Sequence, residues 1–368
     1  PYLNEYVPMR DCHRYYFTGF SGSVAEVLVP IEGKIKLYVD GRYHEQADLE
    51  CNLGLIDVVK TPSTKSNMAL LKEDLEKLGV KDIALEAQRT SLAFYKFLNE
   101  NYNVETRSEV EMNAVIDFEK NPALAPIKQL GIELVGKSTK DKCQDIFKGD
   151  ESFAHFVTAI DSLAWLTNSR GYHLPNLSSF LGKAIAFHDQ VFVFIDEATP
   201  CEVEDEFITF VKLSGDDLAS HLKDILSKRK IEKIYFDEQM VNAQDFISLC
   251  EVFNKDHLVH KAEGLVEFHA IKNEAELNAF RASFKRSDKA IYNTIKWVKS
   301  EVSKGNKVSE LDLYNKTTEC YQEQGAVEQS FGTIAGVDAN GSIIHYGDPK
   351  ADVFMTEDSM CLLDSGGY

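Results

Sequence analysis

The spacing of apolar side chains predicts alternating strands and helices over the first 125 residues. β-branched and aromatic runs bounded by Gly, Pro or Asp predict strands. Met68, Leu71, Leu75 and Leu78 recur at helical spacing, which predicts an amphipathic helix. This alternation indicates a layered α/β unit. The predicted strands cover 24–30, 34–40, 55–59 and 82–85, and the predicted helices begin near Glu45 and cover 66–78 and 91–98.

The same alternation returns over residues 126–265, which suggests a second unit of the same fold. A helix from Ile160 to Ser169 is predicted to end at Gly171, since glycine accepts the left-handed conformation of a helix cap. In that helix Trp165 and Leu166 are interpreted as core, with Asn168 and Arg170 bracing its end. The other predictions are strands over 153–159, 184–187, 191–195 and 234–236, and helices around 222–226 and over 243–252.

Residues 266–368 are predicted to be a third unit. A connector over 262–272 leads into it, and His269 in this connector is expected to be solvated. Asn273 can cap the next helix, with Glu276 as its reciprocal partner. Ser309 and Asp312 predict the start of another helix that runs to about Gln324. The first of these helices carries one apolar face, made of Leu277, Phe280, Phe284, Ile291, Ile295 and Val298.

Two candidate site residues lie near the end of the chain. His345 follows Ile343 and Ile344 and precedes a Gly-Asp-Pro turn, so we expect it at the end of a strand. Asp364 follows the apolar run from Cys361, so we expect it at the end of a buried strand, where a carboxylate needs a cation or a donor. Taken singly, each has a structural alternative: a packed histidine, and an aspartate that forms a turn.

Composition and charge narrow the possible partners. The chain has 59 acidic and 40 basic residues, and its formal charge of −19 argues against nucleic acid and membrane surfaces as partners. No apolar run reaches about 18 residues, so no transmembrane helix is expected. Seven scattered cysteines without a CxxC pair favour reduced thiols and a cytoplasmic location. Because the sequence starts without Met, it leaves room for an upstream targeting segment.

Several motifs occur in the order found in one family. Along the chain they are YFTGFSGS at 16–23, DGRY at 40–43, a D-x-x-A-W-L-x-N-x-R-G helix at 161–171, TIAGVDANGSIIHY at 333–346 and CLLDSGGY at 361–368. Together they resemble Xaa-Pro aminopeptidases of the P type, which are pita-bread metallopeptidases. The resemblance covers essentially the whole chain.

The resemblance implies an α/β fold: two creatinase-like N-terminal α/β domains, at 1–125 and 126–265, followed by the beginning of a pita-bread α+β catalytic domain at 266–368. It implies a homodimeric hydrolase that cleaves peptides with proline in second position and uses two divalent metal ions, manganese being typical. Carried over by motif, His345 contacts the substrate or transition state, Asp364 is a metal ligand, and Arg42 is a substrate-end contact.

The sequence departs from the family in its metal set. The family needs a second Asp, a His and two Glu, all C-terminal to Asp-Ser-Gly, and none of these follows Asp364 before Tyr368. We therefore expect this chain alone to bind no metal stably and to be inactive. One alternative is a non-catalytic pita-bread module that binds peptides or proteins, as in the FACT histone-chaperone subunit. Another is a prolidase or creatine amidinohydrolase, which the second N-terminal unit disfavours.

Overall fold

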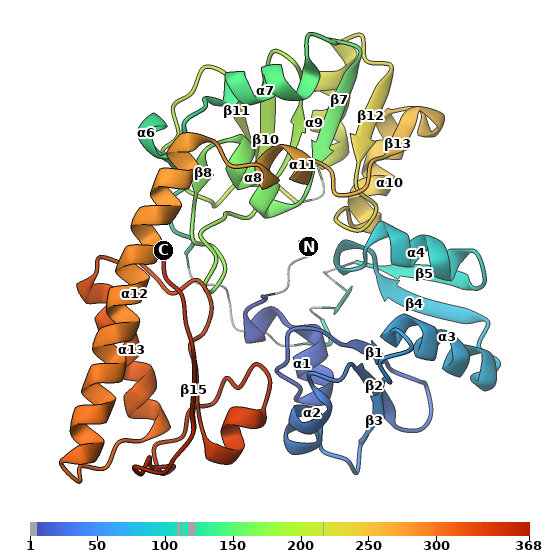
Figure 1. Ribbon diagram of the computed structural model, residues 1–368. Helices are drawn as coiled ribbons and strands as arrows, with labels where there is room; N and C mark the ends of the chain where they lie inside the picture. Colours follow the sequence, from blue (N-terminus) through green and yellow to red (C-terminus); the bar gives the residue numbers. More distant parts are fainter. Residues whose placement is uncertain (1–5, 109–110, 113, 117–122, 216) are drawn as a thin grey trace. The chain divides into compact units, whose positions relative to one another are not determined.

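The structure, a computed structural model, describes residues 6–108, 111–112, 114–116, 123–215 and 217–368 (Figure 1). Contacts within the chain group them into two compact units. The first unit contains mainly residues 80–174 and 178–277, and the second mainly 6–79 and 278–368. The predicted domain limits after residues 125 and 265 stay a prediction.

A six-stranded mixed sheet forms the centre of the first unit. Its strands are β7 (Phe153–Val157), β9 (Lys183–Ala186), β10 (Val191–Asp196), β11 (Ile208–Leu213), β12 (Lys233–Phe236) and β13 (Leu258–His260). Their order is β11-β10-β9-β7-β12-β13. Strand β9 is antiparallel to both neighbours, whereas β12 is parallel to β7 and β13, and β10 is parallel to β11. The strands predicted over 184–187 and 191–195 correspond to β9 and β10, which pair with each other in antiparallel orientation.

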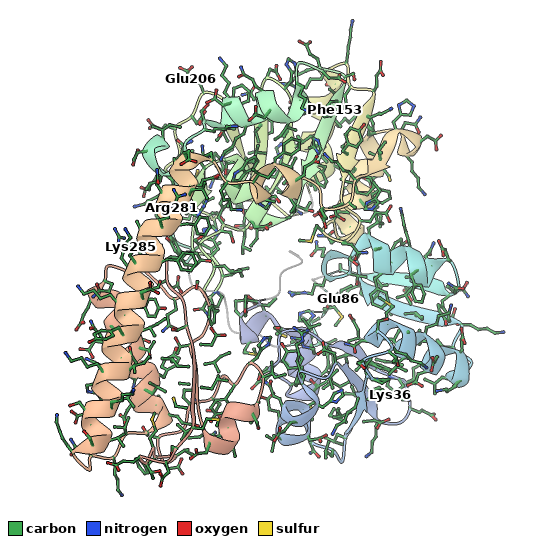
Figure 2. All side chains as sticks on the ribbon, in the orientation of Figure 1. Lys36, Glu86, Phe153, Glu206, Arg281 and Lys285 are labelled. Atoms are coloured by element: carbon green, nitrogen blue, oxygen red, sulfur yellow. The ribbon has the colours of Figure 1, made fainter. Side chains whose placement is uncertain are left out.

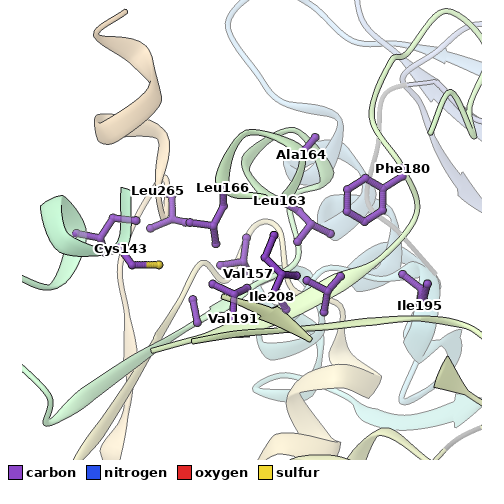
Figure 3. Packing of buried hydrophobic residues seen from close by; sticks show 14 of the residues in the cluster. Cys143, Val157, Leu163, Ala164, Leu166, Phe180, Val191, Ile195, Ile208 and Leu265 are labelled. Carbon is purple, nitrogen blue, oxygen red and sulfur yellow. The ribbon is translucent and has the colours of Figure 1, made fainter. Parts of the chain in front are cut away.

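Helices cover both faces of this sheet. Side chains of successive strand residues point to opposite faces, so Val157 joins one core cluster and Phe156 the other. Figure 3 shows the first cluster, in which Leu163 and Leu166 lie among side chains of the sheet. The first cluster includes helices α7 (Thr139–Phe147) and α8 (Ile160–Leu166), and the second includes α4 (Leu92–Asn99), α9 (Leu218–Ser227) and α10 (Ala243–Val252).

Helix α8 ends earlier than predicted. Its last residue is Leu166, and Asn168, rather than Gly171, has a positive φ of 54°. Asn tolerates this conformation better than most residues, and the next two residues pair as β8 (Ser169–Arg170) with β6 (Lys128–Gln129). The bracing role is confirmed, because Arg170 donates a hydrogen bond to the Ala164 carbonyl at 3.1 Å.

The predicted solvated connector contains a short helix, α11 (Val266–Ala270), and its His269 packs against helix α8 of the same unit. Its Nε2 lies 3.1 Å from the Ser162 hydroxyl, and its ring centroid lies 5.6 Å from that of Trp165. Burial lowers the pKa of His269. The prediction of a solvated His269 was therefore wrong. Other described elements of this unit are β4 (Asp82–Glu86), parallel to β5 (Asn103–Arg107), and α6 (Ile132–Val135).

The N-terminal part of the second unit is a small three-stranded sheet with helices. The strands are β1 (Glu26–Leu28), β2 (Ile35–Val39) and β3 (Ile56–Lys60), and the helices are α1 (His13–Thr18), α2 (His44–Glu50) and α3 (Asn67–Leu78). Strand β2 is antiparallel to β1 and parallel to β3. Helix α1 was not predicted, whereas the other elements match the predicted ones within a few residues. Phe20, Leu37 and Tyr43 lie in their common core.

The rest of the second unit contains two helices and a two-stranded sheet. They are α12 (Glu274–Ser303), α13 (Glu310–Glu323), β14 (Ile334–Val337) and β15 (Cys361–Asp364). Both predicted helix starts are confirmed. Ser309 and Asp312 form a reciprocal capping box, and Asn273 and Glu276 exchange side-chain hydrogen bonds with each other's backbone.

Much of the predicted apolar face of α12 is exposed. Phe280, Phe284 and Ile295 keep 48%, 65% and 44% of their surface exposed, and their neighbours Arg281 and Lys285 extend from the same helix (Figure 2). Ala290 and Thr294 are the buried residues of this helix.

No helix in the described ranges is both long and apolar enough to cross a membrane. All seven cysteines lie in those ranges and are free thiols.

Candidate active site

Asp364 is the last residue of strand β15. The strand is antiparallel to β14, and Asp364 pairs with Ile334. Its predicted place at a strand end is confirmed, but its predicted burial is wrong, because Asp364 and the preceding Cys361 and Leu362 are exposed. Within the described residues, β15 pairs with β14 only. The Asp364 side chain makes no hydrogen bond or ion pair in the described part of the chain.

A buried carboxylate, Glu310, organises the loop that follows β14. Glu310 is the first residue of α13 and is fully buried. Its Oε1 accepts hydrogen bonds from the Val337 backbone at 2.8 Å and from the Asn340 side chain at 3.0 Å. Its Oε2 accepts from the Tyr346 hydroxyl at 2.7 Å and from the Lys350 backbone at 3.0 Å. One side chain thus ties residues 337–350 to the start of a helix.

The four donors determine the charge state of Glu310. Burial by itself raises the pKa of a carboxyl group, but the hydrogen bonds from Lys350, Tyr346, Val337 and Asn340 outweigh it, so the pKa of Glu310 lies below its ordinary value. Burial and the bond to this carboxylate raise the pKa of Tyr346. Glu310 is therefore ionised near neutral pH, with all its acceptor sites directed at the loop.

His345 lies in this loop and not at the end of a strand, so that prediction was wrong. The residues after β14 form a 3₁₀ turn, Asp338–Ser342, and His345 adopts a positive φ of 60°. The Asn340 side chain is held by Glu310 and Tyr346, which bends the backbone where Ile343 and Ile344 favour an extended strand. His345 is exposed, next to the buried Tyr346.

Tyr43 contacts His345 from a segment 302 positions away in the sequence. The Tyr43 hydroxyl lies 2.9 Å from His345 Nδ1 and 2.7 Å from the Ser23 hydroxyl. Its ring is 1% exposed and packs edge-on against Phe20, with centroids 5.5 Å apart. A Cβ at Gly22 would lie 2.9 Å from the Tyr43 ring and would also overlap Phe20, so only glycine fits there.

Arg42, the third predicted site residue, pairs with a neighbouring carboxylate. Its guanidinium donates two hydrogen bonds to Asp40, at 3.0 and 2.9 Å. These bonds hold the pKa of Asp40 below its ordinary value. The guanidinium also lies 5.2 Å from the centroid of the Tyr43 ring, so Arg42 borders the residue that contacts His345.

The described residues do not bring together the ligands of a metal centre. In the part of the chain that the structure describes, no three His, Cys, Asp or Glu side chains gather in a way that could hold a metal ion. Asp364 offers one carboxylate, whereas a stable divalent site needs several ligands at short distances.

Comparison with known proteins matches nearly the whole chain. Models described as the Creatinase/Prolidase N-terminal domain match residues 6–116 and 119–276, and a model of Metallopeptidase family M24 matches 278–368. The chain belongs to the creatinase/prolidase metallopeptidases of family M24. The expected fold class is thus confirmed: two creatinase-like domains followed by the beginning of a pita-bread domain.

Relatives of this M24 chain include two named Xaa-Pro aminopeptidases. A probable Xaa-Pro aminopeptidase P from Laccaria bicolor is 26% identical over 377 residues, and Xaa-Pro aminopeptidase 1 from Dictyostelium discoideum is 25% identical over 389 residues. Each alignment covers 99% of this chain but only 58% and 60% of the relative. The chain therefore spans less than two thirds of the length of these relatives.

A solved structure shares the fold of this M24 chain. It is X-prolyl aminopeptidase from Caenorhabditis elegans, described as a cytosolic enzyme with a di-nuclear active site. The TM-score is 0.85 at 21% identity, over 99% of this chain and 61% of that one.

Sequence reasoning missed two residues that shape this site. Glu310 follows a helix cap, where an acidic residue usually signals only a favourable interaction with the helix dipole. Tyr43 belongs to the Asp-Gly-Arg-Tyr motif, in which the functional role was assigned to the charged Arg42. Tyr43 could have been considered as well, because the hydroxyl of a buried tyrosine usually has a hydrogen-bond partner.

Proposed function

We propose that this chain is part of an Xaa-Pro aminopeptidase, a hydrolase that removes the N-terminal residue from peptides with proline in second position. The observation that carries the proposal is the match to Xaa-Pro aminopeptidases over 99% of the chain, including the M24 segment that contains His345 and Asp364. Two creatinase-like N-terminal domains favour this activity over a prolidase-like one. The proposal includes the domain limits 1–125, 126–265 and 266–368.

In this proposal His345 donates a hydrogen bond to the substrate carbonyl as it becomes an oxyanion. The exposed ring is held at Nδ1 by Tyr43, which leaves Nε2 to face a substrate. Removing such a donor typically lowers the rate by about 10²–10³. Arg42, beside Tyr43, is proposed to contact the far end of the substrate.

Asp364 is proposed as one ligand of a pair of divalent ions, manganese in the first instance. When bound, such ions supply a water of lowered pKa as nucleophile. Because the described residues bring no three ligands together, the complete centre requires ligands beyond these. We therefore propose that the 368-residue chain alone has no peptidase activity and holds no metal stably.

The proposed setting is a cytoplasmic homodimer that acts on peptides and on neither nucleic acid nor membranes. Free thiols and the charge of −19 support the location and the exclusion of anionic partners. The same charge also suits a basic protein partner, which is the basis of the second candidate function, a non-catalytic binding module. Sedimentation of the isolated protein tests the dimer: a monomer at micromolar concentration would contradict it.

The activity is tested on the protein purified from the cells that naturally produce it, with its identity verified by mass spectrometry of peptides from this chain. The variants are introduced into the gene in those cells. The assay follows the N-terminal residue released from an Xaa-Pro-Pro peptide with added manganese. The proposal predicts metal-dependent release and a kcat about 10²–10³ lower for His345→Gln. Cleavage of Xaa-Pro dipeptides alone would indicate a prolidase, and binding of basic peptides without cleavage would indicate the module.

A further inference from the structure

The side chains of Ser23, Tyr43 and His345 form a hydrogen-bonded row in the second unit. The Tyr43 hydroxyl lies between the Ser23 hydroxyl, at 2.7 Å, and His345 Nδ1, at 2.9 Å. All three side chains belong to the same compact unit, although 302 positions separate Tyr43 from His345. Both distances are normal for hydrogen bonds that involve a phenol.

Tyr43 has one proton and two neighbours, so its hydroxyl can donate to only one of them. A neutral imidazole nitrogen is a stronger base than a serine hydroxyl, and a phenol is a more acidic donor than an aliphatic alcohol. The favourable arrangement therefore has Tyr43 donating to His345 Nδ1. In that arrangement the ring proton of neutral His345 must be on Nε2, because Nδ1 acts as the acceptor.

The surroundings fix the position of the phenol. Its ring is 1% exposed, packs edge-on against Phe20, and leaves no room for a side chain at Gly22. On the other side, His345 sits on a strained backbone with φ of 60°, next to Tyr346, which Glu310 binds. Both partners are therefore held by buried groups rather than by flexible surface side chains.

We propose that Tyr43 is a positioning residue that holds His345 in the tautomer with the proton on Nε2 and directs that N–H towards the substrate. The functional part of this inference rests on the proposed role of His345 as an oxyanion donor. An Nε2–H group can donate to a developing oxyanion without a change of protonation, whereas the other tautomer presents a lone pair there. Tyr43 thus prepares the donor before the substrate binds.

The tautomer can be measured directly on the 368-residue chain. Long-range ¹H–¹⁵N spectra of protein labelled at histidine distinguish protonated from unprotonated ring nitrogens, and loss of a signal set in His345→Gln assigns that residue. At a pH where the ring is neutral, we expect a protonated-type Nε2 and an unprotonated-type Nδ1 for His345. A protonated-type Nδ1 in the wild-type protein would overturn the proposal, whatever the variants show.

Tyr43→Phe removes the hydroxyl and keeps the ring. We expect the two nitrogen signals of His345 to move towards each other, because the freed imidazole exchanges between tautomers. Tyr292→Phe is the matched control, since Tyr292 lies on α12 with 64% of its surface exposed, and it should leave these signals unchanged. Signals identical in Tyr43→Phe and wild type would overturn the proposal. Should Tyr43→Phe not fold, the wild-type spectrum decides alone.

The functional test is hydrolysis of the Xaa-Pro-Pro peptide by the protein purified from the cells that naturally produce it, with each variant introduced into the gene there. Tyr43→Phe is expected to lower kcat about fivefold with KM within about twofold, the loss typical of one hydrogen bond. Tyr292→Phe is expected to match wild type. No turnover by the wild-type protein would reject the proposed peptidase and leave the tautomer result standing. Turnover unaffected by Tyr43→Phe would overturn the positioning role alone.

Discussion

Replacement of Glu310 is the sharpest test of how the His345 loop is held. Glu310→Ala leaves four donors without their acceptor, and two of them belong to buried residues, Val337 at 1% and Tyr346 at 7% exposure. A buried donor left unpaired costs about 1–3 kcal/mol, so the free energy of unfolding should fall by about 2–6 kcal/mol. The other two donors, on Asn340 and Lys350, are closer to water and add less.

Glu310→Gln is a milder version of the same change. The amide keeps one acceptor oxygen, which can still accept from Val337 and Asn340, while its NH₂ group replaces the oxygen that bound Tyr346 and Lys350. The Tyr346 hydroxyl can turn and accept from that NH₂ group. We therefore expect a loss of about 1–2 kcal/mol. Glu323→Gln, at the exposed end of the same helix, should stay within about 0.5 kcal/mol of wild type.

Urea unfolding followed by tryptophan fluorescence measures these differences. The chain has two tryptophans, and Trp297 packs against the cluster around Val308 in the second unit. In a Trp165→Phe background the fluorescence therefore reports that unit alone. Equal stability of Glu310→Gln, Glu310→Ala and Glu323→Gln would refute the claim that Glu310 holds the loop.

The Glu310 carboxylate also makes the free energy of unfolding depend on pH. The pKa of Glu310 is lower in the folded chain than its ordinary value of 4.5, so the unfolded chain takes up this proton first as the pH falls. The stabilisation is thus complete above about pH 4.5 and is lost as the pH falls through the folded pKa. Glu310→Gln should lack this component. An identical pH dependence in the two proteins would contradict the assignment.

Three further changes test other parts of the structure. Burial lowers the pKa of His155 to about 3, so stability should fall by up to about 1.4 kcal/mol per pH unit from pH 6.5 towards 3, and His155→Phe should lack this fall. Burial lowers the pKa of Lys142 to about 7, so stability should rise from about pH 7 to 10.5, and Lys142→Met should lack this rise. Gly22→Ala should cost about 1–3 kcal/mol, because its Cβ overlaps Phe20 and Tyr43.

Urea titrations across the pH range measure the first two, with the variants as each other's controls, since each should change only its own pH interval. Parallel curves for wild type and variant would show that the group does not titrate differently on folding. For Gly22, the matched control is Gly41→Ala, where a Cβ would meet nothing within 4 Å. Equal stability of the two glycine variants would contradict the close packing around Tyr43.

Local signals predicted most of the secondary structure. Helix α10 begins and ends at the predicted residues, and the capping box of Ser309 and Asp312 marks the start of α13 as expected. These features depend on neighbours within a few positions, so a single sequence contains them. The early end of α8 was missed because β8 pairs with β6, about 40 positions earlier in the chain.

The candidate site was harder to predict, since its geometry depends on contacts between distant segments. Ile343 and Ile344 favour a strand, but Glu310 bends the loop through Asn340 and Tyr346, and nothing near His345 in sequence indicates this. The contact of Tyr43 with His345 joins opposite ends of the chain. Motif resemblance identified His345, Asp364 and Arg42, whereas only the structure identified the groups that hold the loop.

The proposed activity is tested most directly by peptide hydrolysis. The measurement is manganese-dependent release of the N-terminal residue from an Xaa-Pro-Pro peptide by the protein isolated from its source, beside the purified 368-residue chain with its mass of 41.5 kDa verified. We predict metal-dependent release by the isolated protein and none by the 368-residue chain. An intact isolated protein that releases nothing with any divalent metal would contradict the proposed aminopeptidase.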